Sequence, residues 1–110
     1  MFEKKKIIHF DYYYKTSIEK GIKKATSRLK NYNLELGDVV ECRYTKHNCP
    51  NFYIKINRIN KIKFKNLTND NALSEGYLDV GLLKSVLKSY YPTISSDDFI
   101  YQYEFQYLGV

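Results

Sequence analysis

The sequence predicts a small α+β domain in which short strands form a β-barrel flanked by a few short helices. Apolar and polar residues alternate in several segments of strand length, and turn-forming residues separate these segments at short intervals. Residues 80–90 instead space their apolar residues as a helix does. This order of elements is typical of a small barrel with helices at one end or side. At 110 residues the chain can bury one modest core, so we expect one domain over residues 1–110.

The first half of the chain is expected to begin with a strand at residues 7–10, just after a run of lysines. Residues 16–19, Thr-Ser-Ile-Glu, have the form of a capping box, and Gly21 suits the end of the very short helix between them. Residues 34–38 then predict a turn before a strand at residues 39–44.

The second half is expected to contain further short strands. Apolar residues alternate with polar ones at residues 52–56 and again at 62–64. The clearest strand lies at residues 101–107, where Tyr or Phe alternates with Gln or Glu. We expect its aromatic side chains to form barrel core and sheet surface.

Two helices are predicted between these strands. Residues 68–75 form the first, which Gly76 would close. Asp79 can cap the second, and Tyr91-Pro92 would stop it, because the residue before a proline disfavours the helical conformation.

Charge is unevenly distributed along the chain, whose formal net charge is +6. Residues 1–30 carry nine Lys or Arg against three acidic residues, and residues 43–65 carry seven with no acid. Residues 66–110 carry two lysines against six acids. This asymmetry suits an anionic partner such as RNA, or an anionic substrate. A general excess of lysine that only keeps the protein soluble would produce the same pattern.

The two cysteines do not predict a metal site. Cys42, His47 and Cys49 have the spacing C-x4-H-x-C, and no fourth ligand follows at a familiar interval. Cys42 alternates with Val40 and Tyr44, as a core strand residue would. We expect no metal or other cofactor, and reduced thiols in a cytoplasmic protein. Because no segment reaches the length of a membrane span, we expect no membrane association. We also expect a monomer.

The run Gly21–Arg28 has the form G-x-K-x-x-T-x-R, and Gly37-Asp38 follows it nine residues later. It places Lys23, Thr26 and Arg28 within six residues of one another. A hydroxyl beside an amine can be a nucleophile beside its base. The same group on a basic surface can instead hold a phosphate. Asp38 is expected to shape its turn rather than to act in chemistry.

The chain resembles the ASCH domain family, a branch of the PUA-like β-barrels, from about residue 7 to residue 108. The run Gly21–Arg28 with Gly37-Asp38 carries this resemblance. The segment Ala72–Tyr77 adds to it, since it matches the family pattern A-x-x-E-G-[FY] and precedes a helix that ends in Tyr91-Pro92. Among small members, the chain is most similar to bacterial N4-acetylcytidine amidohydrolases. That resemblance implies Thr26 as nucleophile, Lys23 as its activating base and Glu75 as acid/base.

Each of these residues also has an ordinary structural interpretation. Lys23 would need a lowered pKa to act as a base, and it could otherwise be a surface lysine. Thr26 could be a strand residue selected for fit, and Glu75 a solvated residue at a helix end. Arg28 could bind an acyl oxygen, a ribose or a phosphate, or pair internally with an acid, either Asp38 or Glu75.

Two further residues are predicted to contact substrate or RNA. Lys24 adds positive charge beside Lys23. Tyr13 belongs to the run Tyr12–Tyr14 just upstream of the motif, and such a ring can stack on a base.

The sequence therefore favours a metal-independent amidohydrolase that deacylates an N4-acylated cytidine-type nucleoside. The alternative, from a different class, is a non-catalytic RNA-binding ASCH module that uses the same cleft and the basic half. A ribonuclease is a third interpretation, and a weaker one, because His9 and His47 lie outside the motif.

Overall fold

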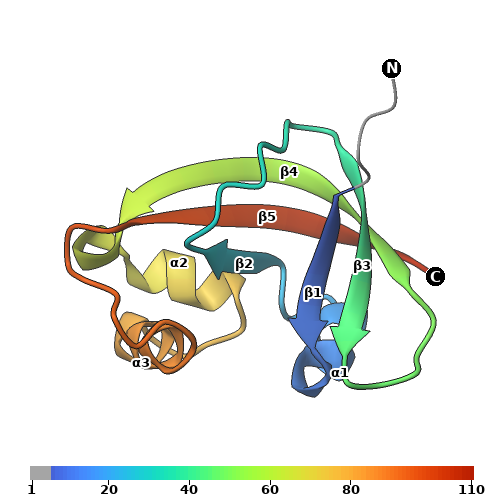
Figure 1. Cartoon of the computed structure of the whole chain (residues 1–110), viewed down its shortest axis with the longest axis horizontal. Coiled ribbons are helices and arrows are strands. Elements are labelled where there is room, and N and C mark those ends of the chain that lie inside the picture. Colours follow the sequence, from blue (N-terminus) through green and yellow to red (C-terminus); the bar gives the residue numbers. More distant parts are fainter. Residues whose placement is uncertain (1–5) are drawn as a thin grey trace.

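The computed structural model describes residues 6–110. Five strands form one sheet in the order β1-β3-β4-β5-β2 (Figure 1). β1 (Ile7–Asp11) pairs in parallel with β3 (Val39–Thr45), and the remaining pairs are antiparallel. The α+β class is confirmed. The predicted closure into a barrel is wrong, because β1 and β2 (Ala25–Arg28) remain the two edges of an open, curved sheet.

The sheet is built mainly on two long strands. β4 (Phe52–Lys63) and β5 (Phe99–Gly109) pair along most of their lengths. The two short strands expected at residues 52–56 and 62–64 are therefore one continuous strand. A register shift between Ile56 and Arg58 bends it and changes the face to which its side chains point. Phe64, expected in a strand, instead begins the 3-10 turn η2 (Phe64–Asn66).

Two of the short helices begin at a side-chain cap, whereas the first along the chain does not. Thr68 caps α2 (Asn69–Ser74) in a complete capping box with Asn71, and Asp79 caps α3 (Val80–Tyr90). These elements were predicted. The capping box expected at residues 16–19 is wrong, because α1 (Lys15–Glu19) begins without a side-chain cap. α1 instead continues directly from the 3-10 turn η1 (Tyr12–Tyr14), whose cap is Asp11.

Two apolar clusters form the core, one at each end of the sheet. The larger lies among β1, β3, α1 and the near halves of β4 and β5, and includes Phe10, Ile18 and Phe105. The smaller packs α2 and α3 against the far ends of β4 and β5 and includes Leu83, Leu87 and Ile100. Figure 1 shows the same division, with α2 and α3 under one end of the sheet and α1 beside β1 and β3 at the other.

Candidate functional site

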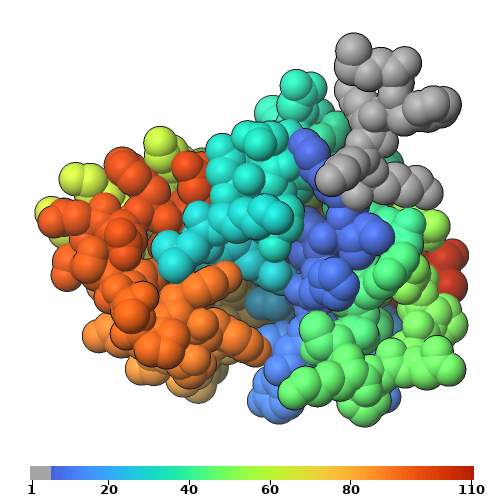
Figure 2. Space-filling view, in the orientation of Figure 1, coloured from blue at the N-terminus to red at the C-terminus, as the bar shows by residue number. Residues whose placement is uncertain are grey.

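A cavity of about 180 Å³ lies where the two apolar clusters meet. Phe10 borders it from the larger cluster, and Leu83 and Leu87 border it from the smaller. Figure 2 shows a hollow between the atoms around α3 and those of β1. Much of the remaining wall is polar or aromatic: His9, Asp11, Tyr14, Lys23, Thr26, Ser27, Arg28, Thr45, Glu75, Tyr77, Tyr90 and Tyr91.

Lys23 is the least expected wall residue, because its charged side chain is only 4% exposed. Its Nζ lies 3.5 Å from Glu75 Oε1 and 4.6 Å and 5.5 Å from the ring centroids of Tyr14 and Tyr77. Burial lowers the pKa of Lys23 below its ordinary value; the nearby Glu75 carboxylate opposes this shift, and Arg28 adds to it. Loss of hydration is the largest cause of the shift.

Glu75 reaches this cavity from the C-terminal end of α2. The Lys24 N–H donates to the Ser74 carbonyl at 2.8 Å, which ties the end of α2 to the chain just before β2. This bond accounts for the meeting of residues some fifty positions apart. The Glu75 side chain is 5% exposed, and its Oε2 accepts hydrogen bonds from Ser27 Oγ and from Gln102 Nε2, the latter at 2.8 Å.

Thr26 and Arg28 come from β2, at the edge of the sheet that faces β1. Arg28 Nε donates to Thr26 Oγ1 at 2.9 Å, and an Arg28 terminal nitrogen donates to the His9 carbonyl of β1 at 2.8 Å. The guanidinium also lies 5.0 Å from the ring centroid of Phe10. One arginine thus bridges the two edge strands that no backbone ladder joins, and it fixes the Thr26 hydroxyl in the cavity wall.

The structure brings Lys23, Thr26, Arg28 and Glu75 to one cavity. Within residues 6–110, no hydrogen bond joins Lys23 directly to Thr26. Among the same described residues, Arg28 forms neither of the acidic pairs considered for it. Asp38 instead accepts from the Glu35 N–H within its turn, as predicted.

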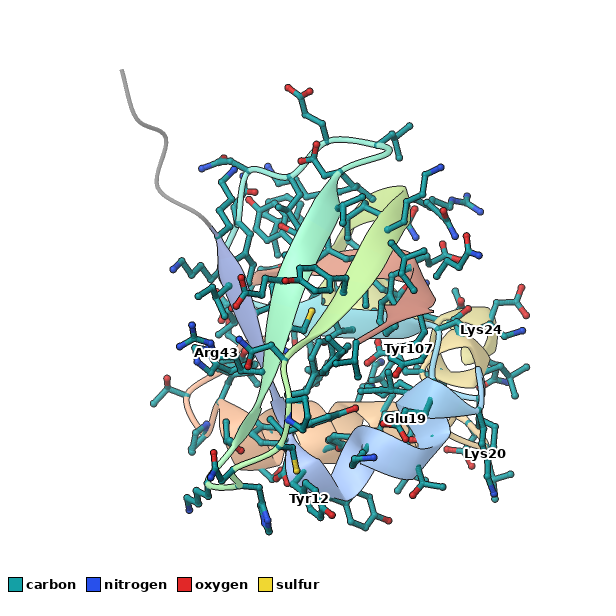
Figure 3. All side chains as sticks on the ribbon, turned by 90° about the vertical axis from the view of Figure 1, so that its right-hand side faces the viewer. Tyr12, Glu19, Lys20, Lys24, Arg43 and Tyr107 are labelled. Carbon is teal, nitrogen blue, oxygen red and sulfur yellow. The ribbon has the colours of Figure 1, made fainter. Side chains whose placement is uncertain are left out.

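Lys24 and Tyr13 do not line this cavity. Lys24 is exposed and lines a separate surface hollow with Glu19, Lys20 and Tyr107, which are labelled with it in Figure 3. Tyr13 is 82% exposed, and its ring contacts Tyr14 edge to face. Their predicted roles in binding remain predictions.

Sequence reasoning missed several residues that line the cavity or that bond to a residue lining it. Gln102 is the clearest, because alternation placed it on the polar side of its strand, yet it is 1% exposed. Ser27 lies inside the motif, and Tyr77 ends the segment Ala72–Tyr77, so their positions were a usable signal. His9, set aside as outside the motif, also lines the cavity. Tyr14 and Tyr77 share a hydroxyl contact of 2.7 Å, and burial raises the pKa of Tyr77 to about 12.

The part of the chain that the structure describes contains no group of three residues arranged to hold a metal ion. Cys42 is a core strand residue, as predicted, and burial raises the pKa of its thiol to about 12. Within residues 6–110 no helix is both long and apolar enough to cross a membrane.

No family model and no curated protein matches this sequence. Solved structures do match its fold. The crystal structure of an ASCH domain from Lactobacillus crispatus superimposes with a TM-score of 0.78 over 94% of this chain and 80% of that one, at 13% identity. The chain has an ASCH-like fold.

Two further crystal structures support the ASCH-like fold. The hypothetical protein PH0355 matches with a TM-score of 0.70 at 17% identity, over 93% of this chain and 97% of its own. The protein EF3133 from Enterococcus faecalis, assigned to the family model DUF984, matches with a TM-score of 0.74 at 11% identity. The match covers 99% of this chain and 78% of EF3133. At these identities the likeness concerns the fold.

Proposed function

We propose that this protein is an amidohydrolase that removes the acyl group from the exocyclic amine of an N4-acylated cytidine-type nucleoside. The observation that carries the proposal is the buried amine of Lys23, which lies 3.5 Å from a buried carboxylate in a cavity that Thr26 also lines. Desolvation lowers the pKa of this amine toward the range in which a general base can accept a proton.

In the first half of the proposed reaction, Thr26 Oγ1 attacks the acyl carbon and its proton passes to Lys23 Nζ. Lys23 transfers this proton to Glu75 Oε1, its nearest carboxylate oxygen. Glu75 then protonates the leaving N4 as the carbon–nitrogen bond breaks. Arg28, already bonded to Thr26, stabilises the developing oxyanion.

In the second half, Lys23 takes a proton from a water molecule that attacks the Thr26 ester. The ester bond to Thr26 Oγ1 breaks and the hydroxyl regains its proton, which releases the carboxylic acid and restores the site. The balance is one amide and one water converted to one amine and one acid.

The size and lining of the cavity support a small substrate. About 180 Å³ is less than a pocket for a drug-sized ligand and suits a single ring with a short acyl arm. The aromatic wall, with Tyr14, Tyr77 and Phe10, suits the faces of a pyrimidine.

Incubation with N4-acetylcytidine tests the proposal, with release of cytidine and acetate as the measurement. Thr26→Ala should lose at least about 10²-fold in kcat, whereas Thr16→Ala, an exposed threonine of α1, should keep wild-type activity. A Thr26→Ala variant that turns over at the wild-type rate would exclude the covalent route. No turnover by the wild type would exclude this substrate.

A second candidate function is binding of single-stranded RNA, and one surface favours it. Lys61 pairs in register with Tyr101, and Lys63 pairs with Phe99, which is 43% exposed. Lys61 Nζ lies 4.4 Å from the Phe99 ring centroid. Exposed rings beside cations form the kind of surface on which bases stack and phosphates bind.

A further inference from the structure

The amide of Gln102 is fully buried and has one possible orientation. Its Nε2 donates to Glu75 Oε2 at 2.8 Å and to the Asn71 carbonyl at 3.0 Å, while its Oε1 accepts from Asn71 Nδ2 at 2.9 Å. Turning the amide over would set its oxygen against two acceptors and its NH2 against a donor. Gln102 can therefore only donate to Glu75.

Asn71 is itself fixed, which makes this orientation rigid. Its Oδ1 accepts from the Thr68 N–H at 2.8 Å within the capping box of α2. The cap of α2 thus holds Asn71, Asn71 holds Gln102, and Gln102 holds the carboxylate at the other end of the same helix.

Ser27 supplies a second donor to the same oxygen, Glu75 Oε2. The two oxygens of Glu75 consequently have different surroundings. Oε2 accepts two hydrogen bonds from neutral donors, and Oε1 lies toward the amine of Lys23. Hydrogen bonds to a carboxylate oxygen stabilise its charged form and disfavour addition of a proton there.

We propose that Gln102 and Ser27 are positioning residues that occupy Glu75 Oε2, so that Glu75 exchanges protons only through Oε1. This inference rests on the proposed function, because it assigns the route by which the Thr26 proton reaches the leaving nitrogen. The proton moves from Lys23 Nζ to Glu75 Oε1 and then to the substrate, while Oε2 never carries it.

The other groups around the carboxylate fit this assignment. Lys23 approaches from the chain before β2 and Tyr77 from the chain after α2, and both line the cavity. Arg28, of β2, donates to Thr26 and His9 rather than to Glu75. Tyr14, of η1, bonds to Tyr77, and Tyr90, of α3, bonds to Asp11.

Gln102→Leu tests the inference, with Gln106→Leu as the matched control on an exposed position of the same strand. With N4-acetylcytidine, Gln102→Leu should lower kcat by about 10- to 100-fold while KM changes less than about threefold, because the carboxylate loses orientation rather than substrate contact. The acidic limb of its pH–rate profile should move to higher pH, since the charged carboxylate has one donor fewer. Ser27→Ala is the substitute variant if Gln102→Leu fails to fold. It removes one hydroxyl donor from Glu75 and should also move the acidic limb to higher pH.

A second measurement does not depend on turnover. NMR of the protein labelled at the glutamate side-chain carbon follows protonation of Glu75 directly, and in both variants this should occur at higher pH than in the wild type. If the wild type is inactive but the NMR shift appears, the proposed function is wrong and the positioning role stands. An unchanged protonation range in folded variants, or an unchanged kcat and pH profile in an active enzyme, would overturn the inference.

Discussion

The pairs Lys23–Glu75 and Lys65–Asp97 are made of the same kinds of group and lie in opposite environments. The surface pair is the shorter, with 2.9 Å between Lys65 Nζ and Asp97 Oδ1 against 3.5 Å in the cavity. Its side chains are 51% and 71% exposed, however, and those of the cavity pair are 4% each. Exposed pairs of this kind add at most about 1 kcal/mol, because water screens them and long side chains lose freedom.

Distance therefore says little about what each pair does. The buried lysine has lost its hydration, and that loss lowers its pKa despite the neighbouring carboxylate. The surface lysine keeps its water and can serve only as a charge. Burial, rather than proximity, separates a lysine suited to proton transfer from one suited to solubility or phosphate contact.

The largest expected effect comes from removing the amine in each environment. Lys23→Met should lower kcat on N4-acetylcytidine by about 10²- to 10⁴-fold, the usual contribution of a general base. Lys65→Met, the matched surface change, should leave kcat unchanged. Steady-state kinetics on variants with wild-type circular dichroism would measure both.

The double variant Lys23→Met with Thr26→Ala sharpens this result. Two members of one catalytic unit are not additive, so the pair should be about as slow as the slower single variant. A double variant slowed by the full product of the two effects would mean that Lys23 and Thr26 do not share a step.

The second prediction concerns stability against pH. The lowered pKa of Lys23 means that, between that value and about 10.5, the unfolded chain holds a proton that the folded protein lacks. The free energy of unfolding of the wild type relative to Lys23→Met should therefore rise with pH in that window, by up to about 1.4 kcal/mol per pH unit. Below the folded pKa the difference should be constant.

Urea unfolding of both proteins at several alkaline pH values measures this difference. Side chains that do not contact Lys23 contribute equally to both proteins, so their contributions cancel, whereas Tyr14 and Tyr77 contact its amine. A difference that stays flat from neutral pH to about 10.5 would mean that Lys23 keeps its charge, which argues for binding rather than base catalysis.

Local chemistry accounts for the parts of the fold that were predictable from sequence. Thr68 and Asp79 cap their helices by accepting from backbone N–H groups three residues away, so these helix starts can be recognised without the rest of the chain. Closure of the sheet could not be recognised in this way. It depends on whether β1 and β2 meet, and the structure joins them through Arg28 instead of a backbone ladder.

The residues of the candidate site were likewise predictable only in part. Lys23, Thr26 and Glu75 were selected through a family resemblance, and the structure places all three in one cavity wall. Gln102 was missed because both faces of β5 are covered where α2 packs against it, so that Gln102 and its neighbour Tyr103 are each 1% exposed, which no alternation in β5 reveals. Lys24, predicted to contact substrate or RNA, lies outside this cavity, and that role stays a prediction.

The smallest expected effect concerns the exposed lysines and RNA. Lys61 and Lys63 lie on the face of β4 opposite Ile62, which packs toward α2 and α3. If single-stranded RNA binds there, the double change Lys61→Ala with Lys63→Ala should flatten the slope of log K against log salt by about 1.4, or about 0.7 for each phosphate that a lysine no longer neutralises. Fluorescence anisotropy with a short oligouridine across a salt series measures that slope.

The matched control for this surface is Lys84→Ala with Lys88→Ala, on α3, which removes the same charge elsewhere and should leave the slope unchanged. A change confined to the α3 variant would place RNA on that helix instead of on β4. No binding at low salt would leave the surface lysines as charge for solubility alone. Their role would then be opposite in character to that of Lys23, whose amine is held away from water and suited to move a proton.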